Sequence, residues 1–512
     1  MKNAPLALAT LAFALGACAP AAAPVSAPAP VEIAPPRAPA VTVAAARADE
    51  SFREHPPAAE APHPFAPPVA ARRKLRNGIP VLMVRQPSQY VAIRIVAAGG
   101  VLDVGPDKFE IVAQMVRGFR AGTTKHSYHD LQGTLAALVM PEPGVAWFAD
   151  AVSISVLVPT THLRAGIELL ADLALRPSFD KTETARWREQ DALDADPKND
   201  GVIADQVMRR VLFGSHGYAA AAVSASRTRA VTRADVVALH ARLFEASRLS
   251  ITAAGGAEDS EILAALEEAF GAAPAHGSSG RGPTTAAPQP PAGPRLVVVD
   301  RPGTTIATIA TSTQGPAFGS PGFEATSLAL DALTDRGFGR ITMRLRDQLG
   351  HVPGIMTTSS SMRVGGSCGW QMRAPTDRVA PALVEADRIL RDFATRGPPD
   401  DELADVKARG VLAFTSWFET SGDTARAFSW PLLFQQQDDW IARRPARFAA
   451  VSMGDVRAAA TRYFDADRMR TVIVGDWATL QTSLTALGWG PVELRTPEGV
   501  VVTPGRGTRA AR

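Results

Sequence analysis

The sequence predicts an α+β fold made of two duplicated domains, each an antiparallel-rich sheet with helices packed on one side. Three observations lead to this prediction. A helix–strand segment is repeated near the end of each half, each half begins with two strand-like runs, and a stretch rich in proline, glycine and serine separates the halves. A length of 512 residues also exceeds what one hydrophobic core usually supports, which favours two domains.

The repeated segment is VTRADVVALHARLFEASRLSITAAGG in the first half and VSMGDVRAAATRYFDADRMRTVIVGD in the second, starting at Val231 and Val451. The two align without a gap, and they share Val, Asp, Phe, Arg and Gly at equivalent places. Each opens with a capping box, Thr232 with Asp235 and Ser452 with Asp455, which predicts a helix that begins there and leads into a strand. We therefore expect two copies of one fold.

Each half also begins with strand-like runs around a turn. RKLRNGIPVLMVRQPSQYVAIRIVAAGG contains Asn77-Gly78, and RLVVVDRPGTTIATIATSTQGP contains Pro302-Gly303, both favourable for a tight turn. Apolar helices are expected next, at 107–119 and 322–334. Longer helical segments are expected at 162–175, 183–213, 376–396 and 400–437.

Two breaks in composition set the expected domain boundaries. Residues 18–70 are mostly Ala and Pro, which predicts a disordered tether, because large apolar side chains are too few to pack. The stretch HGSSGRGPTTAAPQPPAGP at 276–294 predicts a linker. The two domains are therefore expected at 71–275 and 295–490, followed by a tail at 491–512.

The N-terminus has the pattern of a bacterial lipoprotein signal. MKNAPLALATLAFALGAC has a cationic start, an apolar run too short to span a bilayer, and the lipobox Leu15-Gly16-Ala17-Cys18. We expect cleavage of a signal peptide at 1–17 and lipidation of Cys18, which would place the protein in the bacterial cell envelope. Ala19 after the lipidated residue favours the outer membrane, facing the periplasm. Cys368 then has no disulfide partner within the chain.

Composition and motifs exclude two classes of function. The 54 basic and 51 acidic residues leave a formal charge of only +3, which argues against a nucleic-acid partner. No predicted strand is followed by a G-x-G-x-x-G or Walker-type loop, which argues against the common nucleotide-binding folds.

Several further motifs occur in a fixed order. They are LRNGIPVLMV, AAGG before the first helix, RAGT after it, LFGSHGY at 212–218, and then VVVDRPGTT, GRITMRLRDQLG and VIVGD in the second half. Each is weak alone, but with the duplication they make the chain similar to the insulinase-like (pitrilysin) family of zinc metallopeptidases from Arg72 to about Gly488. The resemblance implies the clamshell architecture of that family, in which pairs of such domains enclose a chamber.

The resemblance also shows what the chain lacks. The family carries His-x-x-Glu-His on the first helix, where the histidines bind zinc and the glutamate activates the metal-bound water. Counting back from Gly122-Thr123 places this motif on Ala113, Val116 and Arg117, none of which can replace its counterpart. We therefore expect no intact catalytic site and no cofactor on this chain.

A later zinc ligand of the family aligns with Glu189 in WREQDALDADP, which we interpret as a relic ligand position on a helix surface. His126 and His129, with Asp130 beside them, are the one close pair of histidines, and they can share a helical face. We interpret this segment as a polar, exposed helix start. The isolated residues His162, His216, His240 and His351 are interpreted as structural or surface residues.

The family's second half supplies an arginine and a tyrosine, seven residues apart, that hold the peptide and stabilise the oxyanion. In GRITMRLRDQLGHVPG these positions fall on Arg346 and Pro353, or in another register on Arg344 and His351. Neither register supplies a tyrosine. The arginines are candidates for binding a peptide carbonyl, and the competing interpretation is a structural salt bridge.

In two-chain members of the family one chain carries zinc and its partner does not. The resemblance therefore implies a non-catalytic, peptide-binding partner subunit of a heteromeric zinc peptidase, whose HxxEH-containing chain holds the metal. Peptide substrates could join an exposed sheet edge as an added strand. The alternatives are a stand-alone peptide-binding or assembly lipoprotein, and a metallopeptidase with an unorthodox zinc site built from His126, His129 and Glu189.

Overall fold

The first half of the chain forms one six-stranded sheet with its own helices on one face. The computed structural model describes residues 65–195, 198–219, 224–274 and 286–502. The strands of the first half are β1 (Ala70–Lys74), β2 (Pro80–Arg85), β3 (Tyr90–Ala98), β4 (Gly144–Trp147), β5 (Ala151–Pro159) and β6 (Leu249–Gly255). Its helices are α1 (Val101–Val104), α2 (Glu110–Gly118), α3 (Tyr128–Ala137), α4 (Leu163–Leu175), α5 (Lys181–Leu193), α6 (Asp200–Phe213), α7 (Ala225–Ala230), α8 (Arg233–Leu243) and α9 (Asp259–Phe270).

The second half forms a second six-stranded sheet. Its strands are β7 (Leu296–Asp300), β8 (Ile306–Gly315), β9 (Ile355–Met362), β10 (Gly365–Pro375), β11 (Arg470–Gly475) and β12 (Val492–Arg495). Its helices are α10 (Phe323–Thr334), α11 (Arg340–Thr342), the π-helix η6 (Met343–Gln348), α12 (Val379–Arg396), α13 (Asp400–Thr415), α14 (Ser421–Leu433), α15 (Arg444–Ala450), α16 (Met453–Tyr463) and α17 (Trp477–Thr485).

The two sheets repeat one topology, so the predicted duplication is confirmed. Five strands follow the order β2-β6-β3-β5-β4 in the first sheet and β7-β11-β8-β10-β9 in the second. In both series the first pair is parallel and the other pairs are antiparallel. The sixth strands differ: β1 joins β2 antiparallel, whereas β12 joins β7 parallel.

The capping boxes form as predicted at the two repeated helices. Asp235 N donates to Thr232 Oγ1 at 3.1 Å, and Thr232 N donates to Asp235 Oδ2 at 2.9 Å. Ser452 and Asp455 make the same reciprocal pair at 3.1 and 2.8 Å. These bonds satisfy N–H groups that have no partner inside the helix, and they lower the pKa of both aspartates.

Of the two expected turns, one closes a hairpin and one does not. Asn77-Gly78 joins β1 to β2, which pair antiparallel, and Gly78 has a φ of +90° that favours glycine. Gly303 also has a positive φ, of +78°, but the strands flanking it are not neighbours because β11 lies between β7 and β8. The second turn therefore connects β7 and β8, two strands that are separated in the sheet by β11. The sequence alone did not predict this arrangement.

Two of the long helical segments are interrupted by new N-caps. The segment expected at 183–213 contains α5 and α6, and Asn199 caps α6 by accepting from Gly201 N at 2.8 Å. The segment expected at 400–437 contains α13, a 3-10 turn and α14, and Thr420 caps α14 by accepting from Asp423 N at 3.0 Å. Side chains that bond to backbone N–H groups start helices, and so each segment divides.

Both ends of the expected domains extend further than predicted. Phe65, expected in the tether, contacts the rings of Phe414 and Phe418 at centroid distances of 6.2 and 5.6 Å. Residues 492–495, expected in the tail, form β12 at the edge of the second sheet. The residues at 286–294 of the expected linker contain no helix or strand.

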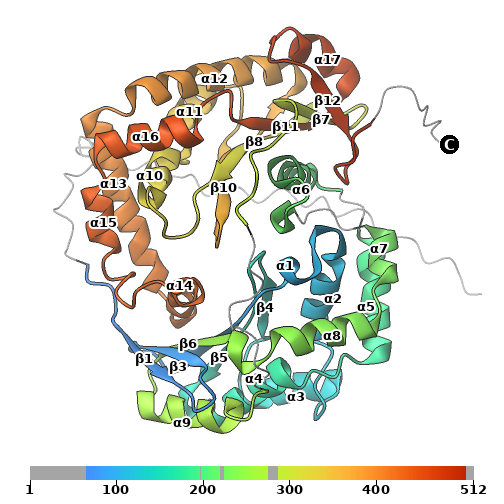
Figure 1. Ribbon diagram of the computed structural model, residues 1–512, viewed down its shortest axis with the longest axis vertical. Helices are drawn as coiled ribbons and strands as arrows, with labels where there is room; N and C mark the ends of the chain where they lie inside the picture. The colour runs from blue at the N-terminus through green and yellow to red at the C-terminus, as the bar shows by residue number, and fades with distance from the viewer. Residues whose placement is uncertain (1–64, 196–197, 220–223, 275–285, 503–512) are drawn as a thin grey trace, which may run out of the picture. The chain divides into compact units, whose positions relative to one another are not determined.

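Each sheet receives a helix from the other half on its second face. Figure 1 shows α14 of the second half beside β6 and β3, and α6 of the first half beside β8 and β11. On the first sheet, the buried residues under α14 are Leu82, Val84, Ala92 and Ala254, packed with Ala425, Phe428 and Leu432. On the second sheet, those under α6 are Val297, Val299, Ala310, Val472 and Val474, packed with Ile203, Val207 and Val211.

This exchange makes the two copies interdependent. The prediction of helices on one side holds for each half's own helices, but the exchanged helices bury the opposite faces as well. Strands buried on both faces read as nearly continuous apolar runs, as β3 does. The described residues from Phe65 onward consequently form one compact unit that contains both halves.

His240 of α8 lies in an aromatic cluster of the first half. Its ring stacks on Phe244 at a centroid distance of 4.9 Å and meets Phe119 and Phe179 edge-on at 5.8 and 5.4 Å. Its Nε2 lies 2.8 Å from the carbonyl oxygen of Ala174, so this nitrogen is the donor. Burial lowers the pKa of His240 below its ordinary value of 6.5, and the bond to Ala174 opposes the shift only in part.

We predict that Phe428→Ala lowers the free energy of unfolding by about 3 to 5 kcal/mol, the usual cost of emptying a buried phenylalanine site. Phe428 lies on the exchanged helix α14 and is 2% exposed, and Leu412→Ala, at a site 70% exposed, is the matched control. Urea unfolding followed by circular dichroism should give one shifted transition. Two transitions, of which the substitution moves only one, would contradict the interdependence of the halves.

We predict that His240 makes the protein less stable as the pH falls below about 6.5. The unfolded state then binds a proton that the folded state, with its lowered pKa, does not bind, so stability rises with pH in this range. His240→Gln keeps an N–H donor without the titration and should flatten the decline between pH 7 and pH 5 in urea unfolding. His129→Gln, at an exposed histidine, should leave the decline unchanged.

Candidate functional site

The helix expected to carry the zinc motif is α2. Val112, Met115 and Phe119 are buried, three or four residues apart, and pack into the core of the first half. Ala113, Val116 and Arg117 are half-buried. The helix is therefore held in place by its apolar face whatever residues its flank carries.

A pocket of about 560 Å³ lies against this flank of α2. Its lining comes from α2, the end of α5, α6 and α7, and includes Glu110, Ala113, Gln114, Asp191, Asp194, Gln206 and Thr228. The pocket is therefore bordered by one of the three changed motif positions, Ala113, together with carboxylate, amide and hydroxyl groups.

Helix α5 presents Asp191 and Trp187 to α2. Gln114 Nε2 donates to Asp191 Oδ2 at 2.8 Å, and Arg117 Nη2 lies 3.6 Å from Asp191 Oδ1. The guanidinium carbon of Arg117 is 5.5 Å from the centre of the Trp187 ring. Arg117 thus forms an ion pair and a cation–π contact at the position predicted to align with the second histidine of the zinc motif.

These residues do not fit a zinc ion. Ala113 has no donor atom, and Arg117 is a permanent cation paired with the nearest carboxylate. Val116 is apolar and cannot accept a proton. Within residues 65–502, apart from the stretches that the structure does not describe, no three His, Cys, Asp or Glu side chains come together as a metal site would require.

Glu189 lies away from α2. Its carboxylate accepts hydrogen bonds from Arg229 of α7, with Nη2 to Oε1 at 2.7 Å and Nε to Oε2 at 3.0 Å. This pairing lowers the pKa of Glu189. Residues two apart on a helix project in nearly opposite directions, and so the α5 carboxylate beside α2 is Asp191 and not the expected Glu189.

His126 and His129 lie at the start of α3. Asp130 serves the capping box there, since its Oδ2 accepts from Ser127 Oγ at 2.7 Å and from Ser127 N at 3.3 Å. The His129 side chain is exposed and its ring contacts Tyr128 at 5.4 Å. The structure therefore uses the segment as a helix start, and its acidic residue as a cap.

Arg344 and Arg346 lie on η6, and both guanidinium groups are paired within the chain. Arg344 Nε donates to Glu385 Oε1 at 2.7 Å, and Arg346 Nε donates to Asp347 Oδ1 at 2.6 Å. This is the salt-bridge arrangement that the sequence left open as the competing interpretation. A peptide carbonyl would have to compete with these carboxylates for either arginine.

The pocket beside α2 offers hydrogen-bond acceptors instead of reactive groups. Glu110 is buried, and its Oε1 accepts from Arg227 Nε at 2.7 Å and from Ser224 N at 3.3 Å. Gln114 Oε1, Gln206 Oε1 and Thr228 Oγ1 are buried and bond to no donor in the described part of the chain. Such a site can bind N–H groups, but it contains no paired nucleophile and base.

A polar network between the halves was not predicted from sequence. The Tyr218 hydroxyl donates to Asp150 Oδ1 at 3.0 Å, and Arg363 N donates to Asp150 Oδ2 at 2.8 Å. Val364 N donates to the Tyr218 hydroxyl at 3.3 Å. Burial raises the pKa of Asp150. LFGSHGY contains Tyr218 and was noticed as a motif, but nothing in the sequence pairs it with Asp150.

The comparisons with known proteins concern both sequence and fold. Residues 230–409 match the family described as Peptidase M16 inactive domain. No curated protein matches the chain. Among solved structures, a peptidase M16 inactive domain from Pseudomonas fluorescens is similar at 19% identity and a TM-score of 0.71, over 80% of this chain and 98% of that chain.

Two proteases have similar folds. A protease from Helicobacter pylori matches at 15% identity and a TM-score of 0.73, over 80% of this chain and 100% of that chain. The periplasmic protease PqqL from Escherichia coli matches at 14% identity and a TM-score of 0.65, over 82% of this chain and 47% of that chain. At these identities the likeness establishes the fold, and the predicted α+β architecture is confirmed.

We predict that installing the missing motif creates a zinc site that uses Asp191. A variant with Ala113→His, Val116→Glu and Arg117→His should bind zinc in calorimetric titration, whereas the unaltered chain should not. Adding Asp191→Asn should weaken this binding about ten- to a hundredfold, as loss of a supporting group does in metal sites. Adding Glu189→Gln is the control. If Glu189→Gln lowered the zinc affinity more than Asp191→Asn did, the third zinc ligand would be Glu189 and not Asp191.

Proposed function

We propose that the protein is a non-catalytic, peptide-binding partner subunit of a heteromeric zinc peptidase. Residues 230–409 match the family described as Peptidase M16 inactive domain, and the fold is similar to that of a solved domain of this description. The observation that carries this proposal is that α2 is present but lacks zinc-binding side chains. The helix lies in place, yet Arg117 pairs with Asp191 where a zinc ligand would be. A scaffold without catalytic residues is what a partner of a catalytic chain requires.

The proposal assigns zinc and the general base to a second, HxxEH-containing chain. This chain covers 47% of PqqL, so that protease has the length of about two such units in one polypeptide. In the proposed enzyme the second unit would come from the partner. Contact between two such units would form the substrate chamber.

Peptide substrate could bind at the open edge of the first sheet. Strand β4 is the last strand of that sheet, and among the described strands it pairs with β5 alone. Within the described part of the chain its other edge is therefore open to a further strand. An extended peptide can join such an edge as an added strand. Because β4 contacts α2, a peptide bound there would lie near the altered motif.

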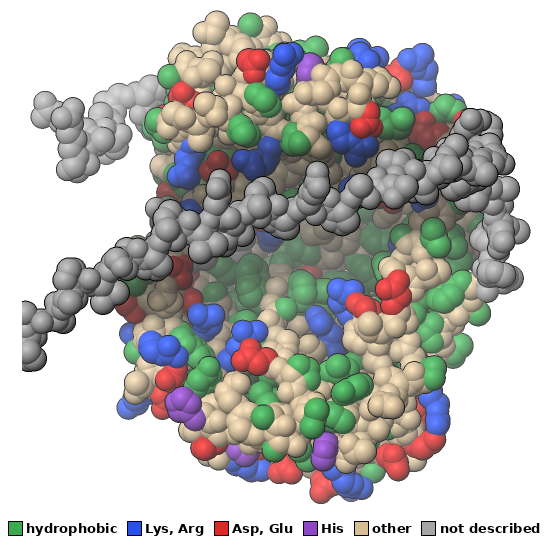
Figure 2. Space-filling view, turned by 180° about the vertical axis from the view of Figure 1, so that it is seen from behind, with side chains coloured by type: hydrophobic (Ala, Val, Ile, Leu, Met, Phe, Trp, Pro, Cys, Tyr) green, Lys and Arg blue, Asp and Glu red, His purple; other side chains and the backbone are tan. Residues whose placement is uncertain are grey.

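We further propose that the protein is anchored by lipid in the cell envelope, in the outer membrane facing the periplasm. The signal peptide at 1–17, Cys18 and nearly all of the tether lie outside the described residues. Among the residues that are described, no helix is long and apolar enough to cross a bilayer. Figure 2 shows basic and acidic side chains interspersed over one face, which supports the expectation that nucleic acid is not a partner.

The test is a pull-down of tagged, soluble protein starting at Cys18→Ser, with co-purifying chains identified by mass spectrometry. We expect the isolated chain to be free of zinc and inactive on peptides, and to gain both properties only with an HxxEH-containing chain. Zinc and cleavage in the isolated chain would contradict the proposal. Peptide binding with no peptidase partner would instead support the stand-alone lipoprotein.

A further inference from the structure

Arg94 is the one charged residue of β3. Its neighbours on the same face of the strand are Ala92 and Val96, which are buried on the side of the sheet that α14 covers. Arg94 itself is half-buried there. A guanidinium in such a place is costly unless an anion or hydrogen-bond acceptors compensate for the lost water.

The chain does not supply that compensation. Arg94 Nη2 donates to Ser153 Oγ at 2.8 Å, but Arg94 Nε is buried and donates to no acceptor in the described residues. Arg94 forms no ion pair with a carboxylate in that part of the chain. Burial, and then the like charge of Arg426, lower the pKa of Arg94 to about 10, so the group is still charged at neutral pH.

The fold does not require an arginine at this position. Arg94 pairs with Thr252 of β6, and in the duplicated half Ala310 pairs with Val472 of β11. Thr252 and Val472 occupy the same place in the gapless repeat, so Ala310 is the structural equivalent of Arg94. Ala310 is buried under the exchanged α6. The same sheet position is thus filled by a small apolar side chain in the other copy.

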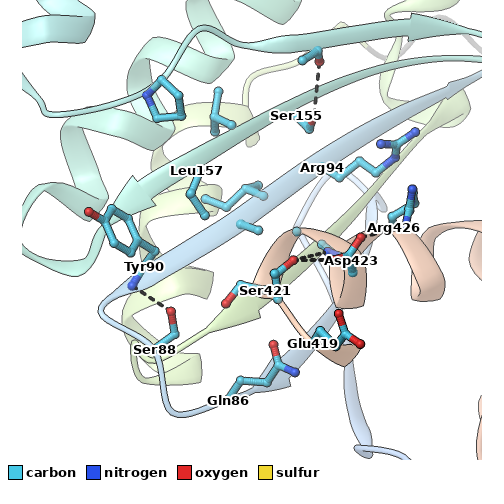
Figure 3. A pocket seen from close by; sticks show the side chains of 18 of the residues that line it. Gln86, Ser88, Tyr90, Arg94, Ser155, Leu157, Glu419, Ser421, Asp423 and Arg426 are labelled. Atoms are coloured by element: carbon cyan, nitrogen blue, oxygen red, sulfur yellow. Dashed lines mark hydrogen bonds and ion pairs between the residues drawn. The ribbon is translucent and has the colours of Figure 1, made fainter. Parts of the chain in front are cut away.

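Arg94 lines a pocket of about 740 Å³ between the first sheet and the start of α14. In Figure 3 the side chains of Arg94 and Arg426 lie on the same side of this pocket, and those of Tyr90 and Leu157 lie on another. The first turn of α14 also borders it, and the leading N–H groups of a helix favour an anion. The pocket therefore has a cationic side and an apolar side.

Three carboxylates also line the pocket. Asp423 Oδ1 accepts from Arg426 Nη2 at 2.7 Å, and its Oδ2 accepts from Thr420 Oγ1 at 2.6 Å. Asp423 and Arg426 therefore neutralise each other, and Arg426 can support a ligand only through its N–H groups other than Nη2. Glu142 and Glu419 are exposed to solvent. Exposed charges are screened by water and salt, so these two glutamates weaken the binding of a carboxylate at Arg94 less than buried carboxylates would.

We infer that this pocket binds the carboxylate of a peptide, with Arg94 as the recognition residue and Arg426 and the start of α14 in support. The apolar side accommodates the side chain next to that carboxylate. Glu142 and Glu419 favour a peptide that carries a basic residue elsewhere. The inference rests on the peptide-binding part of the proposed function, and it requires no partner subunit.

The test measures peptide binding to the full soluble chain by calorimetry at low salt. The probe is acetyl-Lys-Ala-Leu with a free C-terminal carboxylate, compared with its C-terminal amide. Acetyl-Lys-Ala-Glu-amide carries its carboxylate on a side chain. It therefore shows whether the pocket binds a side-chain carboxylate as well as a C-terminal one. We expect the free acid to bind about ten- to a hundredfold more tightly than the amide, as charge-assisted hydrogen bonds imply.

Arg94→Ala should remove this preference without lowering the melting temperature, because alanine fills the equivalent position as Ala310. Arg426→Gln should weaken the same binding at an exposed site. Arg164→Ala is the matched control: Arg164 is 69% exposed on α4, pairs with Glu268, and should bind the probe as the unaltered chain does.

Equal affinity for acid and amide, or a preference that survives Arg94→Ala, would overturn the inference. The inference would also be overturned by two results together: Arg94→Ala lowers the melting temperature strongly, and Arg426→Gln binds the probe as the unaltered chain does. Arg94 would then have a structural role. These results leave recruitment of a zinc-bearing partner untouched. Conversely, failure to recruit a partner does not affect binding of the probe to the isolated chain.

Discussion

The reciprocal exchange of α6 and α14 is the interaction on which the rest of the structure depends. Each sheet has one face covered by its own helices, and its other face would be open without the helix that the opposite half supplies. The two halves are therefore related as duplicates but stabilised as one body. The exchange also places the start of α14 over β3 and thereby forms the wall of the pocket at Arg94.

Local signals in the sequence were sufficient to predict the repeated helices and strands. They were insufficient to predict how these elements pack together. The capping boxes at Thr232 and Ser452 predicted both helices, because a cap is made by residues three apart in the chain. The amphipathic pattern of α6 and α14 shows that each helix buries one face, but it does not say against which sheet. The caps at Asn199 and Thr420 were present in the sequence and were not recognised as breaks.

In the candidate site, too, some features could be predicted from the local sequence and others depend on packing. The helix α2 lies within the segment where a helix was predicted, while the alignment of Ala113, Val116 and Arg117 with the zinc motif stays a prediction from spacing. The carboxylate of α5 that contacts α2 is Asp191, while Glu189 pairs with Arg229 on the helix surface, and only the packing of α5 fixes which of the two faces α2. Arg94 is the one charged residue of an apolar strand, yet whether it has a counterion depends on its three-dimensional neighbours, which the sequence does not give.

The strand order has a consequence for how the chain acquires its structure. In each sheet a strand made late in synthesis lies between two strands made early: β6 lies between β2 and β3, and β11 lies between β7 and β8. Since β2 and β3 leave the ribosome or a translocation channel well before β6, the centre of the first sheet stays open during that interval. Non-local pairings of this kind are slow and expose strand edges to aggregation, so we expect completion of the sheets to limit the folding rate.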